Sequence, residues 1–223
     1  MKAALGLLPR VPCPAMSKAV QPRFRRYSSE TRAAMLVDAS LVCLARGGIP
    51  DFTIDSICRE AGVSRGLITH HFGSKDGLLA AVYATMYDRL LSTITPADAP
   101  MPSLADLVEA TFAPEVFNRS SLKIWLALWG EIANNAALQA VHRRRYGDFR
   151  ASVVQAITAE AARRNRTVDA DALAVMFIAL SDGVWLEQAI DPSMLSPAAA
   201  QEACFGLLEA YLGPLPRTTG ATG

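Results

Sequence analysis

The chain has 223 residues, of which 51% are hydrophobic and 19% are charged. This balance fits a folded protein with a sizeable core and excludes an intrinsically disordered chain. Lysine and arginine number 22 against 21 acidic residues, so the overall charge names no partner. We find no apolar run of the roughly 18–20 residues that a membrane-spanning helix needs, and we expect a cytoplasmic bacterial protein without a membrane partner.

The N-terminal residues 1–22 contain a short apolar run that prolines interrupt, which predicts a disordered leader rather than a secretory signal. Met16 is an alternative start of translation. The cysteines are scattered and form no CxxC pair, so we expect buried, reduced thiols, with a reactive sensor thiol as the alternative. They are Cys13, Cys43, Cys58 and Cys204.

Four helices are predicted before residue 96, each starting at a hydroxyl side chain that can accept a hydrogen bond from the free backbone N–H groups of the first turn. These N-caps are Ser28, Thr53, Ser64 and Ser74. Gly47-Gly48 ends the first helix and Gly62 the second, whereas the fourth helix reaches Thr95 before Pro96 breaks it. The stretch 96–103 has the composition of a linker.

Helical periodicity resumes after this linker and predicts five further helices. Their ranges are 104–113, 122–134, 137–164, 170–190 and 198–212. Ser196 caps the last of them, with Pro197 in its first turn and Gly213-Pro214 after its end. Because no strand pattern is present, the fold class is all-α. We expect a DNA-binding domain over 23–90, a C-terminal domain over 91–213, and a disordered tail over 214–223.

The second and third predicted helices are joined by "AGVS", a spacing typical of a helix-turn-helix motif. Ala61 is small where the two helices approach, and Gly62 can adopt the left-handed turn conformation. Val63 fills the corner from inside. The next helix then presents its N-terminal residues outward, and such a helix fits the major groove of B-DNA.

The string "TIDSICREAGVSRGLITHHFGSKDGLL", preceded by "CLARGG", resembles the DNA-binding domain of the TetR family of bacterial regulators. The resemblance covers about residues 28–90. "GLITHHF", "WLALWGEIANN", "HRRRYGDFR" and "DGVWLE" resemble the BetI-like branch, whose namesake is a choline-responsive repressor. Many TetR relatives carry Thr and two Tyr where this chain has Leu67, Thr69 and His70, so the resemblance does not carry over an operator sequence.

The candidate DNA-contacting residues lie on and around the third helix. They are Thr53, Ser64, Arg65, Gly66, Leu67, Thr69, His70, His71 and Lys75. Arg65 is suited to a guanine edge and Leu67 to a thymine methyl group, and Lys75 at a helix start is suited to a phosphate. The resemblance places His71 at the phosphate backbone. For Arg65 and Thr69 the alternative is ordinary surface polarity.

A metal site at the His70–His71 pair is not expected. Adjacent residues on a helix point about 100° apart, and no third ligand stands nearby. We also expect no cofactor. The arginines Arg23, Arg25 and Arg26 form an arm that can reach the DNA backbone or minor groove, or else a solvated basic tail.

The two C-terminal helices predict dimerisation. The segment 170–190 is apolar on nearly all faces and must be buried on both sides. With 198–212 it resembles the last two helices of the family, which form a four-helix dimer interface. A homodimer also matches two half-sites about 34 Å apart on DNA. The alternative is a purely intramolecular core.

The tryptophans are candidates for the effector site. Trp125 and Trp129 share one helix face, and Trp185 lies on the long apolar helix. Aromatic faces attract a quaternary ammonium such as choline, although the residues can equally be core. Phe117, Phe149 and Phe177 are candidate pocket walls. Glu131, Asp182 and Glu187 are candidate counter-charges, and the sequence does not decide among them.

The sequence therefore predicts a ligand-responsive, homodimeric transcriptional regulator, a repressor released from double-stranded operator DNA by a small molecule. We expect no enzyme, because no nucleophile–base spacing, phosphate-binding glycine loop or metal constellation is present. A helical protein that binds a small molecule without acting through DNA is the alternative.

Overall fold

In the computed structural model, residues 28–94 and 102–217 are described, and the regular structure in these ranges is entirely helical. This confirms the predicted all-α class. The helices are α1 (Ser29–Gly47), α2 (Ile54–Ala61), α3 (Gly66–Phe72), α4 (Lys75–Ile94), α5 (Leu104–Thr111), α6 (Arg119–Ile132), α7 (Ala136–Arg163), α8 (Ala170–Ile190) and α9 (Pro197–Leu212), with one 3-10 turn, η1 (Ile49–Asp51), after α1. The predicted leader, its arginine arm and Cys13 lie outside the described ranges.

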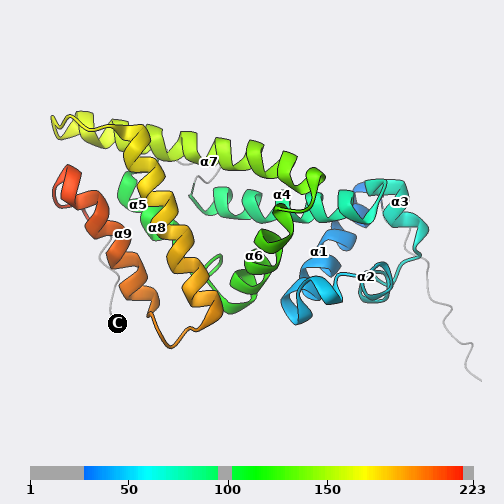
Figure 1. Cartoon of the computed structure of the whole chain (residues 1–223). Coiled ribbons are helices and arrows are strands. Elements are labelled where there is room, and N and C mark those ends of the chain that lie inside the picture. Colours follow the sequence, from blue (N-terminus) through cyan, green and yellow to red (C-terminus); the bar gives the residue numbers. More distant parts are fainter. Residues whose placement is uncertain (1–27, 95–101, 218–223) are drawn as a thin grey trace, which may run out of the picture.

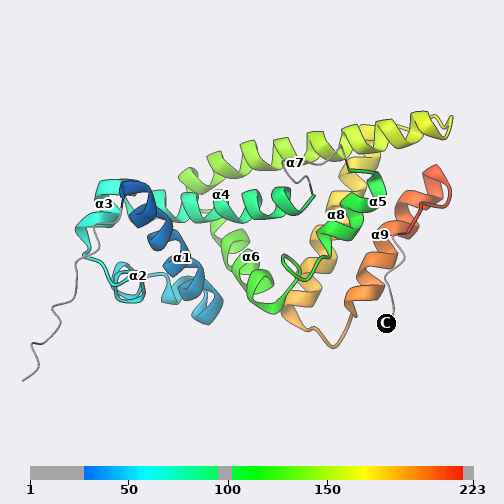
Figure 2. The same ribbon diagram turned by 180° about the vertical axis from the view of Figure 1, so that it is seen from behind.

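The molecule is elongated, with α1, α2 and α3 at one end and α8 and α9 at the other (Figure 1). The long helices α4 and α7 lie side by side and join the two ends, which the view from behind also shows (Figure 2). Helix α6 crosses between them and packs against both α1 and α8. Helix α4 continues unbroken through residue 90, so one rigid element connects the two predicted domains.

Local capping explains where the N-terminal helices begin. The side chains of Ser28, Thr53 and Ser74 accept hydrogen bonds from the backbone N–H groups of Thr31, Ser56 and Gly77, at 3.0–3.1 Å, as predicted. The predicted cap at Ser64 is wrong. Helix α3 starts at Gly66 with Arg65 at the N-cap position, and no side chain caps it. Instead the carbonyl groups of Ser64 and Arg65 accept from Leu67 and Ile68 in a tight turn.

Two glycines allow close approaches around α3, one where it follows α2 and one where α4 passes its end. Gly62 adopts the left-handed conformation at φ 65° and ψ 33°, as predicted, and this lets the chain reverse between α2 and α3. Gly77 lies where α4 passes the end of α3. A Cβ atom on Gly77 would lie 2.1 Å from the carbonyl oxygen of Phe72, so no larger residue fits without moving the backbone.

Helix α8 differs from its prediction in one respect. One face is buried, but Val175, Met176, Leu186 and Ile190 are exposed on the other. The sequence required burial on both sides, and the single protomer supplies only one packing surface. Among the described helices, α8 is also long and apolar enough to cross a membrane, which is weak evidence because core helices meet the same criterion.

Candidate DNA interface and effector cavity

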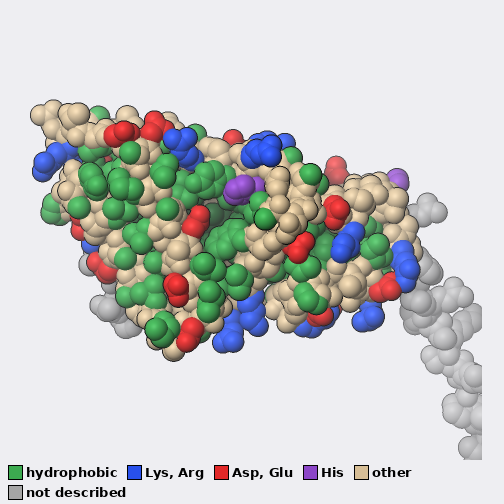
Figure 3. Space-filling model, in the orientation of Figure 1, with side chains coloured by type: hydrophobic (Ala, Val, Ile, Leu, Met, Phe, Trp, Pro, Cys, Tyr) green, Lys and Arg blue, Asp and Glu red, His purple; other side chains and the backbone are tan. Residues whose placement is uncertain are grey.

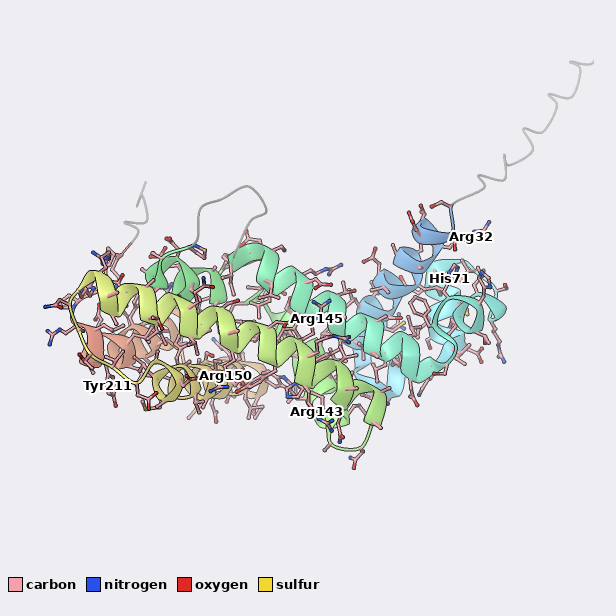
Figure 4. The ribbon with its side chains drawn as sticks, turned by 90° about the horizontal axis from the view of Figure 1, so that it is seen from above. Arg32, His71, Arg143, Arg145, Arg150 and Tyr211 are labelled. Atoms are coloured by element: carbon pink, nitrogen blue, oxygen red, sulfur yellow. The ribbon has the colours of Figure 1, made fainter. Side chains whose placement is uncertain are left out.

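The candidate DNA-contacting residues gather at the α3 end of the molecule. Seven of them are exposed, whereas Leu67 and His71 are half-buried. The exposed ones are Thr53, Ser64, Arg65, Gly66, Thr69, His70 and Lys75. Ile68, which the motif turns inward, is only 1% exposed and anchors α3 to the core. Figure 4 shows Arg32 of α1 at the same end as His71, so α1 adds a further positive charge there.

Arg65 forms an ion pair with Asp55 of α2. Both side chains are more than half exposed, at 72% and 57%, so this pair contributes little to stability. Its consequence is positional, because it holds the guanidinium beside the helix-turn-helix corner. A contact between Arg65 and a base edge has to compete with this acidic partner.

The rings of the two histidines contact each other. Their ring centroids lie 4.9 Å apart in an edge-on arrangement, and Nε2 of His71 is buried without a hydrogen-bond partner. Within the described ranges, no group of three or more histidine, cysteine or acidic side chains is placed to hold a metal ion. Lys75 extends over the ring of Phe52, with its Nζ atom 5.9 Å from the ring centroid.

A cavity lies where α4, α5, α6, α7 and α8 meet, and its space of about 400 Å³ includes a part that is open to solvent. Figure 3 shows a hollow framed by hydrophobic side chains on this part of the surface. The cavity is lined by Tyr87, Leu90, Thr111, Trp125, Trp129, Tyr146, Phe149, Ile178, Ser181, Asp182 and Trp185. Its mainly apolar lining with a few polar groups is typical of small-molecule sites.

The predicted effector residues fall into two groups. Trp125, Trp129, Trp185 and Phe149 all line this cavity. Phe117 does not line it, but supports it from behind, with its ring 5.5 Å from that of Trp185. Phe177, which was also a candidate wall, is fully buried and is not part of the lining.

Trp125 is the centre of an aromatic cluster. Its ring lies 5.1 Å from Tyr87 at 89°, 5.9 Å from Trp129, and 6.2 Å from Trp185. The contacts of Trp125 with Tyr87 and Trp185 are edge-to-face, an arrangement that aromatic pairs prefer. Sequence reasoning missed Tyr87 and Tyr146. The spacing of Tyr83 and Tyr87, one helical turn apart, is the signal that could have pointed to an aromatic face on α4.

Among the described residues, Asp182 is the only one that brings a carboxylate to the cavity lining. The residue is exposed on α8, but its carboxylate is crowded by the protein, and this burial raises its pKa to about 6. Glu131 and Glu187, the other candidate counter-charges, do not line the cavity. Nearby, the indole Nε1 of Trp185 is buried without a hydrogen-bond partner.

Polar contacts tie α4 to the helices on either side. The Tyr83 hydroxyl oxygen lies 2.7 Å from Nδ1 of His142 on α7. Burial lowers the pKa of His142, which favours the neutral imidazole that can accept this proton. Asp88 pairs with Arg145 at 2.8 Å, and Figure 4 shows Arg145 between α4 and α7. Arg89 pairs with Asp38 of α1 at 3.0 Å.

The outer face of α8 and α9 carries exposed apolar and small residues. Small exposed residues follow the helical repeat on α9, namely Ala199, Ala203, Gly206 and Ala210. Tyr211 of α9 donates to the sulfur of Met176 of α8 at 3.9 Å, and both residues are exposed. Tyr211 lies at the end of the molecule opposite His71 (Figure 4). Small residues allow two helices to approach closely, so this face is suited to another helix pair.

Comparison with known proteins places the two regions in one class. Residues 36–82 match the family model for bacterial regulatory proteins of the tetR family, and residues 100–213 match the BetI-type transcriptional repressor C-terminal domain. The HTH-type transcriptional regulator BetI of Paraburkholderia phymatum is 32% identical over 180 residues, covering 77% of this chain and 88% of that protein.

Solved structures show the same fold. A putative transcriptional regulator from Pseudomonas aeruginosa PAO1 is 34% identical, with a TM-score of 0.71, and the match covers 85% of this chain and 94% of that one. A putative transcriptional regulator from Saccharomonospora viridis, solved in complex with choline, is 20% identical with a TM-score of 0.65, covering 82% and 97%. The second likeness supports the fold alone.

The fold, the exposed α3 and these matches define a ligand-responsive, DNA-binding transcriptional regulator. The chain belongs to the TetR family, in its BetI-type branch of transcriptional repressors. Repressors of this family bind operator DNA and an effector, and they dimerise. The names of its relatives are those of regulators rather than enzymes, and nothing favours the alternative of a ligand-binding protein that does not act through DNA.

Proposed function

We propose that this repressor binds operator DNA as a cytoplasmic homodimer and releases it when a small cation occupies the cavity lined by Trp125 and Asp182. The proposed DNA-binding domain is 23–90, and the proposed effector and dimerisation domain is 91–213. One observation carries this proposal. Helix α4 lines the cavity with Tyr87 and Leu90, and its other end follows directly on α3.

The DNA interface is proposed at the exposed residues around α3. Arg65 reads a guanine after leaving Asp55, and Thr69 and His70 face the groove. Lys75 and the N-terminal N–H groups of α4 bind a phosphate, since a helix start is electropositive. His71 and Thr53 complete the backbone contacts. Leu67, half-buried, offers only part of its side chain to a thymine methyl group.

The effector is proposed to be a quaternary ammonium such as choline. Indole and phenol faces attract a desolvated cation, and Trp125, Trp129 and Tyr87 supply three such rings around one space. Asp182 supplies the counter-charge. The unpartnered Trp185 Nε1 can donate to an oxygen of the ligand. The choline complex of the S. viridis regulator supports this chemistry by fold-level likeness.

The dimer is proposed to form through α8 and α9. Their exposed apolar and small residues leave a face that a second copy of the same helix pair can cover. Burial of Val175, Met176 and Ile190 there would remove apolar area from water at about 25 cal/mol per Å². The same contact would complete the second packing surface that the sequence of α8 requires.

The test is footprinting of the purified protein on the DNA that flanks its own gene. Choline, betaine aldehyde and glycine betaine are added separately. We expect a protected palindrome that either cation releases and that the zwitterion, whose carboxylate Asp182 repels, leaves in place. Protection that is the same with and without either cation would contradict the proposal of a cationic effector. Binding that does not weaken as salt increases would contradict the phosphate contacts.

A further inference from the structure

A second cavity lies between the α3 end and the effector cavity. It is bounded by α1, α4, α6 and the segment before α6. Its space of about 660 Å³ includes a part that is open to solvent. We name it the interdomain cavity. It is lined by Leu41, Val42, Ala45, Met86, Arg89, Leu90, Glu115, Val116, Ser120, Ser121, Ile124 and Trp125. The family comparisons assign it no role.

The two cavities share a wall. Leu90 of α4 and Trp125 of α6 line both of them. Both side chains are nearly buried, at 7% and 3% exposure. The closest ring neighbours of Trp125 include Tyr87, Trp129 and Trp185, which line the effector cavity, and none of these three lines the interdomain cavity. On its effector side Trp125 is therefore flanked by aromatic rings, and on the other side it adjoins the space of the interdomain cavity.

Helix α1 forms the far side of the interdomain cavity through Leu41, Val42 and Ala45. The Arg89–Asp38 ion pair joins α4 to α1 close by. Helix α1 in turn packs against α2 and α3, which carry the candidate DNA contacts. A change in the volume of the interdomain cavity therefore reaches the recognition helix through a short, continuous set of packed elements.

We propose that Trp125 and Leu90 form a movable wall, which an effector displaces into the interdomain cavity, so that α1 and the recognition helix shift away from the DNA-competent position. This inference rests on the proposed effector site. Packed interiors resist compression, so a displaced indole moves where space already exists. The effector then favours the state in which the interdomain cavity is filled from the effector side, and this shifts the population away from operator binding.

The experiment replaces the effector with a side chain, so it does not depend on the identity of the effector. Ser181 lines the effector cavity, is 3% exposed, and donates only to the carbonyl oxygen of Ile178 in its own helix. Ser181→Leu adds apolar volume at the wall. Val42, 47% exposed, lines the interdomain cavity from α1, and Val42→Phe fills it. The probe is an operator duplex selected by the wild-type protein from randomised DNA.

We expect Ser181→Leu to weaken operator binding by about tenfold, within the range of typical allosteric couplings. Val42→Phe alone occupies space that is already present and leaves Trp125 and Leu90 in place, so operator affinity should stay within about twofold of wild type. The double variant should recover operator affinity to within about threefold of wild type. Its melting temperature should be lower than the sum of the two single effects predicts, because the volume added at the wall has no free space to enter. Leu126→Phe, on an exposed part of α6 outside the interdomain cavity, is the matched control and should give no recovery.

Equal operator affinities of Ser181→Leu with and without Val42→Phe would overturn the movable wall. Thr111→Leu, at a second buried position in the effector cavity, repeats the test if Ser181→Leu does not fold. Folded variants at both positions that bind the operator as wild type does would also overturn it. If choline does not change operator binding by the wild type while the double variant recovers binding, the proposed cationic effector is wrong and the movable wall is supported.

Discussion

The α3 end and the effector cavity differ in how their residues are brought together. The candidate DNA contacts lie between residues 53 and 75, and most of them point into solvent from one short motif. The cavity draws its lining from five helices between residues 87 and 185, and it buries most of its aromatic side chains. The exposed side chains at the α3 end can exchange solvent for another partner, whereas the buried side chains of the cavity exclude water and transmit strain through close packing.

This difference teaches where a substitution acts. A change at an exposed residue of α3 is expected to remove a proposed contact with DNA and to leave the fold alone, because such a side chain packs against little else. A change in the cavity alters both ligand binding and the packing of α4, α6 and α8. Five substitutions, two at the α3 end and three at other sites, would break or sharpen this comparison, and the largest effect is expected at the proposed dimer interface.

Ala203→Arg places a charge in the exposed small-residue face of α9 without burying it in the protomer. We expect monomers in light scattering and an operator affinity about 100-fold lower or more, because the two half-sites are no longer bound as one unit. Ala137→Arg, an exposed alanine on α7, is the control and should stay dimeric. A dimer that persists in Ala203→Arg would place the interface elsewhere.

Arg65→Ala and Lys75→Ala should each weaken operator binding by about tenfold or more, equivalent to about 1–3 kcal/mol. The two effects differ in kind. Loss of Arg65 should relax the preference for one base, whereas loss of Lys75 should weaken binding to all sequences and lower its salt dependence. Arg144→Ala, exposed on α7, is the control. Fluorescence anisotropy with a panel of single-base operator variants measures both, and unchanged affinity in both variants would remove α3 from the interface.

Asp182→Asn should weaken choline binding by about tenfold in calorimetry, because a desolvated cation loses its counter-charge. The pKa of Asp182 is raised to about 6 by burial, so its carboxylate is charged above that pH and neutral below it. Choline affinity of the wild type should therefore fall as pH decreases from about 8 to about 5, through this pKa. In Asp182→Asn this dependence should disappear; if it persists, another group titrates with the ligand.

Tyr83→Phe tests the weakest of these links. It removes the hydroxyl group that lies 2.7 Å from His142 Nδ1 while keeping the ring against Tyr87 and Trp125. We expect a loss of about 1 kcal/mol in urea unfolding, the net contribution of one hydrogen bond. Operator affinity should change little, since the ring packing of α4 remains. A loss no larger than experimental error would mean that the imidazole finds another donor.

Local rules determined much of the α3 end from the sequence. The structure matches the predicted caps at Ser28, Thr53 and Ser74 and the left-handed conformation of Gly62. At the other end of the molecule it matches the predicted bounds of α8. Each of these features depends on residues only a few positions apart. The exception is Ser64, where a tight turn satisfies the first backbone groups of α3 before a side chain is needed. The sequence also determined that Trp125 and Trp129 share a helix face, because side chains four apart lie one turn from each other.

Only the tertiary structure decided what that shared face meets. Tyr87 and Tyr146 join the cavity, Phe117 supports it from behind, and Asp182 rather than Glu131 or Glu187 lies in the lining. It also placed Gly77 against the Phe72 carbonyl group. The physical reason is that a helix repeats its own geometry along the chain, whereas the rotation of that helix against its neighbours follows from packing between residues up to a hundred positions apart.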